Sequence, residues 1–119
     1  MDRIAIVFVA GGLGSVARYG AGVLLGPVWA TFAVNVVGSF LIAVVLELAV
    51  RIADFPVNLR LALATGLLGG FTTYSTFNAE STGLWLEGAQ LRAALNVIGT
   101  VVACMAAGLL GLWLARRLA

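Results

Sequence analysis

Four long apolar stretches, separated by three short breaks, make up almost the whole chain. We place them at residues 4–25, 31–50, 59–85 and 91–114. Each is long enough to cross a bilayer as a helix, which takes about 20 residues. The pattern predicts an all-α membrane protein whose residues 1–119 form a single transmembrane domain of four transmembrane helices. An even number of spans places both termini on one side of the membrane.

Turn-forming or polar residues mark each break. Gly26 and Pro27 lie in the first break, and the stretch from Arg51 to Asn58, with Pro56, forms the second. The third break is the short segment 87–90, of sequence EGAQ. Such residues commonly end helices, so we expect the four helices to be joined by short turns.

The third stretch differs from the others because polar residues interrupt its centre. Gly69 and Gly70 precede the segment FTTYSTF at 71–77, which holds five consecutive hydroxyl residues. Two poor helix formers followed by β-branched threonines favour a break in the helix. Non-helical backbone at membrane depth is tolerated where protein buries it or where it lines an aqueous path, and half-helix ends commonly bind ions. We therefore expect the third helix to be broken near its centre, at a functional site. A simple packing kink is the alternative.

An aromatic stripe runs along the same segment. Phe71, Tyr74 and Phe77 repeat every three residues and Glu80 continues the stripe, while Ser75 lies on a flanking face. The edge of an aromatic ring is electropositive, so it can replace water around an anion when hydroxyl groups assist. Tyr74 and Phe77 are therefore candidate anion contacts, with plain helix packing as the alternative.

Other polar residues lie within the apolar stretches. Asn35 and Thr31 share one face of the second stretch, and Asn96 and Thr100 are one turn apart in the fourth. Polar residues inside a membrane indicate a functional site, although an Asn that only joins helices fits the spacing equally well. Arg18 is costly in lipid, so we expect it near an interface, a water-filled vestibule or a partner.

Composition excludes several classes of function. The chain is 62% hydrophobic and only 10% charged, which is typical of a membrane protein. Its single cysteine, Cys104, leaves no internal disulfide, and the lack of histidine removes the usual zinc sites and nucleophile-plus-base pairs. We therefore expect no enzymatic activity.

The few charged residues indicate an orientation. The net charge of +2 rests on seven basic residues, all arginine, which are too few and too dispersed to bind nucleic acid. Five of them lie on the side of the termini, and Arg18 and Arg92 lie toward the other side. Basic residues favour the cytoplasmic side, so the termini are predicted to be cytoplasmic.

Three motifs carry a resemblance to a known family. They are GGLGSVARYG at 11–20, TFAVNVVGSF at 31–40 and GLLGGFTTYSTFNAE at 66–80. In matching order and across nearly the whole chain, they resemble the Fluc/CrcB family of small fluoride channels. The resemblance implies a four-helix protomer in an antiparallel dual-topology dimer, with two fluoride pores and a central structural Na+ ion at the dimer axis.

The same resemblance implies roles for individual residues. Asn35 would be the pore amide, and Tyr74 and Phe77 would occupy two aromatic positions around the ion. Gly69 and Thr72 would give backbone carbonyls to Na+. Ser75 and Thr76 would belong to a hydroxyl-lined pore wall, and Arg18 and Glu80 would stand near the vestibules. To this wall we add Thr31, from its place one turn before Asn35, and Thr100 as a secondary candidate. Tyr74 departs from the family pattern, in which this position is usually phenylalanine.

These expectations lead to a function and a location. The chain is predicted to be a passive channel that exports fluoride through a bacterial or archaeal plasma membrane, in complex with a second copy of itself. The arginine bias leaves a heterodimer with a paralogue open, because a chain that inserts equally both ways should show little bias.

Two rival functions compete with the channel. A small proton-coupled multidrug exporter would need a carboxylate embedded in the membrane, commonly in its first helix, and the first stretch has none. The other rival is a non-conducting structural subunit whose glycines and hydroxyl groups serve only helix packing.

Overall fold

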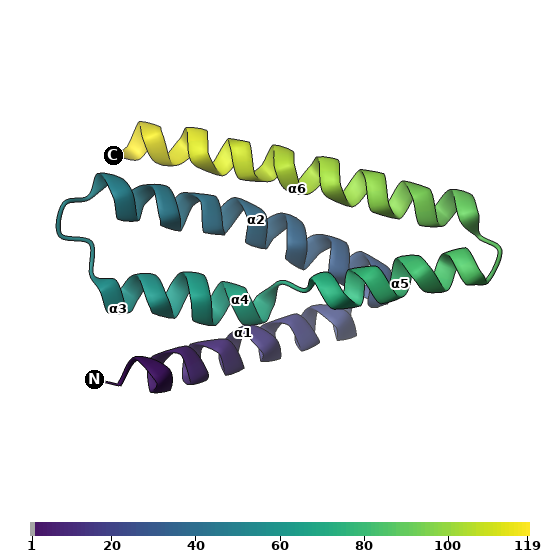
Figure 1. Cartoon of the computed structure of the whole chain (residues 1–119), viewed down its shortest axis with the longest axis horizontal. Coiled ribbons are helices and arrows are strands. Elements are labelled where there is room, and N and C mark those ends of the chain that lie inside the picture. The colour runs from purple at the N-terminus through teal and green to yellow at the C-terminus, as the bar shows by residue number, and fades with distance from the viewer. Residues whose placement is uncertain (1) are drawn as a thin grey trace.

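Long helices run back and forth along one axis, and both ends of the chain lie at the same end of the bundle (Figure 1). This computed structural model describes residues 2–119. Over these residues the chain is all-helical and contains no strand. The protein measures 52 × 31 × 20 Å, so its long axis is sufficient to cross the roughly 30 Å hydrocarbon core of a bilayer.

The first two helices are joined by a single glycine. Helix α1 spans Arg3–Leu25, and the Asp2 carboxylate caps it by accepting a hydrogen bond of 2.9 Å from the amide of Ile4. Gly26 has a φ of 82°, a conformation that favours glycine, and it turns the chain directly into α2, Pro27–Arg51. Proline suits the first position of a helix because it has no amide hydrogen to satisfy there. Helix α2 therefore begins one turn before the predicted start at Thr31.

The third apolar stretch is divided into several segments. It begins with α3, Val57–Arg60, continues as a π-helix, η1, Leu61–Leu68, and reaches α4, Gly69–Phe71. Thr72 and Thr73 are then extended, with ψ angles of 157° and 116°. Helix α5, Tyr74–Leu86, completes the stretch. The glycine pair is thus still helical, and the chain leaves the helix at the two threonines that follow it.

The last helix is the longest. Helix α6 spans Gln90–Leu118 and continues one turn beyond the predicted end at Leu114. Within residues 2–119, α1, α2 and α6 are each long and apolar enough to cross a membrane. The third stretch is not among them, because the break divides it and its longest helical segment, α5, has only 13 residues. The chain is accordingly a multi-pass membrane protein.

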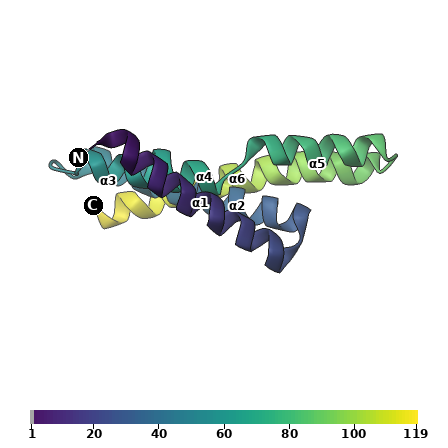
Figure 2. The same cartoon turned by 90° about the horizontal axis from the view of Figure 1, so that it is seen from below.

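The two halves of the third stretch pack against different helices. Segments η1 and α4 lie along α1, whereas α5 lies beside α6, as the two views in Figures 1 and 2 show. Helix α2 packs along α6 and contacts the other segments from its opposite side. The extended residues Thr72 and Thr73 lie where the chain passes from one neighbour to the other.

Glycines allow the close approach of α1 to the third stretch. A Cβ atom on Gly14 would collide with the carbonyl oxygen of Leu67, and one on Gly70 would collide with the carbonyl oxygen of Gly11. In lipid, where apolar surface gains little by contacting other apolar surface, such close backbone contact is what holds helices together.

Few large side chains are buried inside the single chain. Val34, which is 1% exposed, is the largest side chain among the described residues that is fully enclosed. Many Leu, Val and Ile side chains instead lie on the outside, as expected for helices that face lipid or another subunit. At the end that holds the termini, the Glu47 carboxylate joins α2 to α6 by accepting hydrogen bonds from Arg51 (2.7 Å) and Arg116 (3.0 Å).

Candidate functional site

The break in the third stretch is held by one side chain of α2. The Nδ2 of Asn35 donates to the carbonyl oxygen of Thr73 at 3.0 Å, and its Oδ1 accepts from the amide of Thr73 at 2.8 Å. Both backbone groups of an extended residue are thereby satisfied at a depth where an unpartnered one would cost several kcal/mol. The sequence predicted Asn35 as a polar site residue, and the structure places it at the break.

Thr73 also begins the next helix. Its Oγ1 accepts from the amide of Thr76 at 3.2 Å and lies 3.0 Å from the Oγ1 of Thr76, to which it donates. This is the usual geometry of a helix N-cap, which is worth about 0.5–2 kcal/mol. Thr76 is therefore already engaged, whereas Ser75, with its Oγ 3.4 Å from that of Thr73, is exposed.

Because of these hydrogen bonds, two backbone carbonyl oxygens no longer accept from their regular helical donors. In a continuous α-helix, the Thr73 amide would donate to Gly69 and the Thr76 amide would donate to Thr72. Here the first amide donates to Asn35 and the second donates to the Thr73 hydroxyl. The carbonyl oxygens of Gly69 and Thr72 thus lose their regular helical donors. These are the two residues for which the sequence predicted backbone oxygen ligands.

An open groove of about 400 Å³ lies against the break, between α2, the third stretch and α6. We call it the central groove and define it by six residues: Asn35, Gly69, Thr72, Tyr74, Phe77 and Thr100. It therefore brings together six of the eleven predicted site residues, drawn from three different parts of the chain.

The two aromatic residues of the central groove differ in burial. Phe77 is 8% exposed and the Tyr74 side chain is 79% exposed. Their rings meet edge to face, with centroids 5.9 Å apart and an interplanar angle of 65°. Phe77 is thus enclosed by the chain's own packing, while most of the Tyr74 side chain is open to lipid or another molecule.

Among the described residues, Thr100 carries the one hydroxyl group that is buried without a hydrogen-bond partner. It is 5% exposed, yet its Oγ1 is buried without a hydrogen-bond partner among the described residues. Four other hydroxyls donate to the carbonyl one turn back in their own helix: Thr31, Ser39, Thr72 and Ser81. A buried polar atom left unsatisfied costs about 1–3 kcal/mol, so the Thr100 hydroxyl is available to an external ligand.

A second groove, of about 440 Å³, lies on the other side of the break. We call it the side groove and define it by Arg18, Thr31, Thr73, Thr76 and Glu80. Both predicted vestibule residues, Arg18 and Glu80, are therefore in one groove, together with Thr31. The guanidinium of Arg18 donates from Nε to the carbonyl oxygen of Gly70 at 3.1 Å, which ties α1 to the end of α4.

The Glu80 carboxylate is only partly satisfied. The Thr31 hydroxyl lies 2.9 Å from its Oε1 and 3.0 Å from the carbonyl oxygen of Pro27. One hydroxyl hydrogen serves only one of these acceptors at a time. Glu80 Oε2 is buried and has no partner within residues 2–119. The side groove thus holds an acceptor that needs a donor from outside the chain.

Sequence reasoning missed two residues of this region. Thr73 received no role of its own, although it is both clamped by Asn35 and the cap of α5; its place before the helix that begins at Tyr74 is the signal that marks a cap. Ser81 was also missed. It accepts a hydrogen bond of 2.9 Å from Nδ2 of Asn96 and so joins α5 to α6.

The sequence was compared with known proteins. A family model described as "CrcB-like protein, Camphor Resistance (CrcB)" matches residues 5–112. The chain belongs to the CrcB family. The resemblance drawn from the three sequence motifs is thereby confirmed.

Relatives of this CrcB-family chain match it along its whole length. A protein of Agrobacterium fabrum (strain C58) is 44% identical over 124 residues, covering 99% of both chains, and is named fluoride-specific ion channel FluC. Proteins of Geobacter sp. (strain M21) and Geobacter sulfurreducens carry the same name, with 40% and 42% identity over 99% of this chain and 100% of theirs. The family is thus one of ion channels and not of enzymes.

Proposed function

We propose that this chain is a fluoride-selective passive ion channel. The observation that carries the proposal is the central groove, where a broken helix, two aromatic rings and a buried hydroxyl without a partner lie together. The names of the relatives, which match over the full length, support fluoride as the transported ion.

Selectivity for fluoride would follow from the donors that this groove offers. Fluoride is small and strongly hydrated, so a pore that selects it must replace water with compact donors and exclude larger anions by size. Thr100 offers a free hydroxyl, and the rings of Tyr74 and Phe77 offer their electropositive edges. Ser75, Thr76 and Thr31 would extend the hydroxyl-lined wall. Thr31 would do so only by giving up the hydrogen bond that it now donates within the chain, whereas Thr76 accepts from Thr73 and keeps its own hydroxyl hydrogen.

Asn35 would serve the pore in two ways. Its amide has two N–H groups, of which one holds the Thr73 carbonyl, so one N–H remains for a passing anion. Its carbonyl oxygen is occupied by the Thr73 amide and therefore turns away from the ion path. The residue would both hold the break open and present a donor beside it.

The side groove would form a vestibule. Arg18 contributes the positive charge that attracts an anion from water, and Glu80 contributes an acceptor beside it. Arg18 donates its Nε hydrogen to the carbonyl oxygen of Gly70, so its other guanidinium N–H groups would remain for an anion in the groove.

The freed carbonyl oxygens of Gly69 and Thr72 are the type of ligand that a sodium ion binds. A hard cation takes several oxygen ligands, and one chain supplies two here. Two copies related by an axis would supply four. Bound there, Na+ would contribute a fixed positive charge that stabilises the dimer interface. This chain's own contribution is to hold both oxygens free by means of Asn35 and Thr73.

A second copy in antiparallel orientation is the partner that we propose. The central groove lies open along one face of the chain, and the Tyr74 ring projects from it. Closing it with an identical face would give two pores, one for each groove. Five arginines on the terminal side against two on the other favour one orientation, so a paralogue of opposite bias is the alternative partner.

The proposed direction of transport is out of the cytoplasm of a bacterium or archaeon. In an acidic medium, fluoride enters cells as the neutral acid and becomes trapped inside as the anion. A passive channel in the plasma membrane would release that anion down its own gradient without an energy source.

Ion release from liposomes tests this proposal. Liposomes loaded with potassium fluoride or potassium chloride and reconstituted with the purified chain should release fluoride but not chloride, as read by ion-selective electrodes. Equal release of both ions would contradict selectivity. If the wild-type chain is silent, the Tyr74→Phe variant is measured. Release by that variant assigns the block to the phenol, whereas silence of both folded variants contradicts a channel formed by this chain alone.

A further inference from the structure

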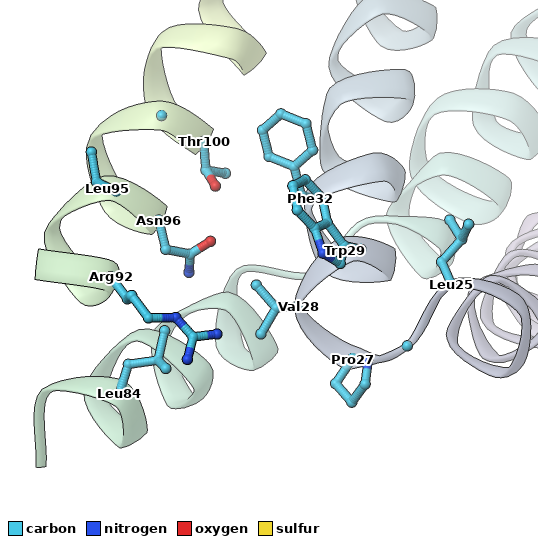
Figure 3. Close-up of a pocket in the computed structure, with 12 residues that line it drawn as sticks. Leu25, Pro27, Val28, Trp29, Phe32, Leu84, Arg92, Leu95, Asn96 and Thr100 are labelled. Carbon is cyan, nitrogen blue, oxygen red and sulfur yellow. The ribbon is translucent and has the colours of Figure 1, made fainter. Parts of the chain in front are cut away.

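A third groove, drawn in Figure 3, lies beside the turn between α1 and α2. This turn is at the end of the bundle away from the termini (Figure 1). The groove has a volume of about 570 Å³ and lies between the start of α2, the later part of α5 and the first half of α6. We call it the outer groove and define it by Trp29, Phe32, Leu84, Arg92, Asn96 and Thr100. None of the roles given above uses Arg92 or this groove.

The polar residues of the outer groove form a row on α6. Arg92, Asn96 and Thr100 are spaced four residues apart, which places them one above another on the same face of the helix. Figure 3 shows their side chains directed into the space that Trp29 and Phe32 enclose from the opposite side. A polar row therefore faces an apolar wall, an arrangement that guides a small polar solute along one side.

Thr100 is the point where the outer and central grooves meet. It lines both of them, and its buried hydroxyl lacks a partner among the described residues. An ion that left the outer groove would find this hydroxyl first. Asn96 lies one turn before it. Its side-chain amide donates one hydrogen to Ser81, and its second N–H is free to donate to an anion.

Arg92 stands at the outer end of the row. It is exposed, and within residues 2–119 it makes no ion pair or hydrogen bond. Glu87, in the turn between α5 and α6, is the nearest carboxylate along the chain, and it forms no ion pair with Arg92 in the described structure. By contrast, Arg51 and Arg116 share Glu47, and Arg117 stacks on the Trp113 ring at 4.7 Å. Arg92 thus presents an uncompensated charge at the mouth of a groove.

We propose that the outer groove is an entrance to the anion path, in which Arg92 concentrates the anion at the mouth and the α6 row leads it past Asn96 to Thr100. This inference rests on the proposed channel function. Its ligand is a small free anion, fluoride in this case. A lipid phosphate would satisfy the same guanidinium, but the row continues inward to a buried hydroxyl, which a headgroup does not need.

Varying the ionic strength distinguishes whether Arg92 attracts the anion or only stabilises the structure. Fluoride release is measured for Arg92→Gln, Arg92→Lys and the wild type in vesicles of neutral phosphatidylcholine. Arg60→Gln is the matched control, because it removes the same charge from an exposed position that does not line the outer groove. The salt is varied on both sides of the membrane, because the released fluoride enters from the lumen. It runs from about 0.01 M to about 1 M, which shortens the Debye length from about 30 Å to about 3 Å.

At low salt, Arg92→Gln should slow fluoride release by about fivefold, because local charge raises the concentration of a steered ion. The difference should disappear at high salt. Arg92→Lys should keep most of the wild-type rate, and Arg60→Gln should match the wild type throughout.

Several results would overturn the inference. One is a wild-type rate for Arg92→Gln at every salt concentration, and another is a loss that is the same at low and high salt. A loss that occurs only when anionic phosphatidylglycerol is added to the vesicles would assign Arg92 to a lipid headgroup instead. A wild-type chain that conducts no fluoride would refute the proposed function, and this inference with it, before any variant is compared.

Discussion

The side chain of Asn35 makes the two hydrogen bonds that a helix backbone would otherwise make to Thr73. A residue in the middle of a helix has its amide and carbonyl satisfied by neighbours four residues away, and Thr73 has neither partner in that form. The primary amide of Asn35 supplies both a donor and an acceptor in the correct spacing. Few other side chains offer this pair of groups, which explains why the position suits asparagine.

Replacing Asn35 by aspartate should therefore impair both stability and transport. Asn35→Asp removes the donor to the Thr73 carbonyl and sets a carboxylate oxygen against it, at a cost of about 1–3 kcal/mol for the unsatisfied group. We expect lower thermal stability in detergent by circular dichroism and at least a tenfold loss of fluoride release, since one tenfold change corresponds to about 1.4 kcal/mol. Asn58→Asp, an identical change at an exposed position of α3, should leave both unchanged. Normal flux through Asn35→Asp would contradict the assigned role.

Residue type alone identified much of the candidate site. A polar amide within an apolar stretch and an aromatic stripe beside hydroxyl residues are visible in the sequence. The pairing of Asn35 with Thr73 is not, because the two residues are separated by 38 positions and only the fold brings them together. Thr100 is a similar case. Its one-turn spacing from Asn96 is visible in the sequence, but the absence of a hydrogen-bond partner depends on its three-dimensional surroundings.

At the scale of helices, glycine has two separate roles in the third stretch. Gly70 remains helical and allows α4 to press against the backbone of α1 at Gly11. The chain leaves the helix only at Thr72, where Asn35 can hold the extended backbone. The glycine pair in the sequence thus marks a close contact, and the break follows directly after it.

A pair of alanine substitutions distinguishes such contact glycines from the others. Gly70→Ala would place a methyl group against the carbonyl oxygen of Gly11, and overpacking of this kind costs about 1–3 kcal/mol. Gly12→Ala meets nothing within 4 Å and should be neutral or stabilising by about 0.4–1 kcal/mol, because alanine favours a helix. Thermal unfolding in detergent measures both. Equal melting temperatures for the two variants would argue against tight packing of α1 on α4.

The π-helix η1 could not be predicted from the sequence. The segment LALATGLL is apolar almost throughout, so no polar position marks the wider turn. Helix length was easier to predict, since the long apolar runs of α1, α2 and α6 are evident without a structure. The extension to Pro27 follows from the suitability of proline for the first position of a helix. The extension beyond Leu114 adds a last turn that carries Arg116 and Arg117.

For the whole molecule, the exposed central groove is the feature that requires a partner. If this mainly apolar groove faced hydrocarbon, the Thr100 hydroxyl and the freed carbonyls would be left without ligands. The sequence alone indicates four spans and an arginine bias. It does not show which face of the bundle carries the groove, because that depends on how α2 and α6 pack.

We expect two chains in the functional particle. The chain has a mass of 12.3 kDa, so light scattering corrected for detergent should give a protein mass of roughly 25 kDa for a symmetric dimer. A tag on the C-terminus should be cleaved by external protease in only part of the molecules if the two copies are antiparallel. A particle of a single chain that still releases fluoride would exclude the shared pore.

The passage of the third stretch from α1 to α6 sets the order in which the protein can be assembled. The first half of that stretch finds its neighbour, α1, among residues already made. The second half packs against α6, which follows it in the chain and therefore leaves the ribosome later. Ser81 of α5 therefore gains its donor, Asn96, only after α6 has been made, whereas Glu80 can already bond to Thr31 of α2. The second half of the third stretch thus settles into its final place later than the first half, which docks on α1.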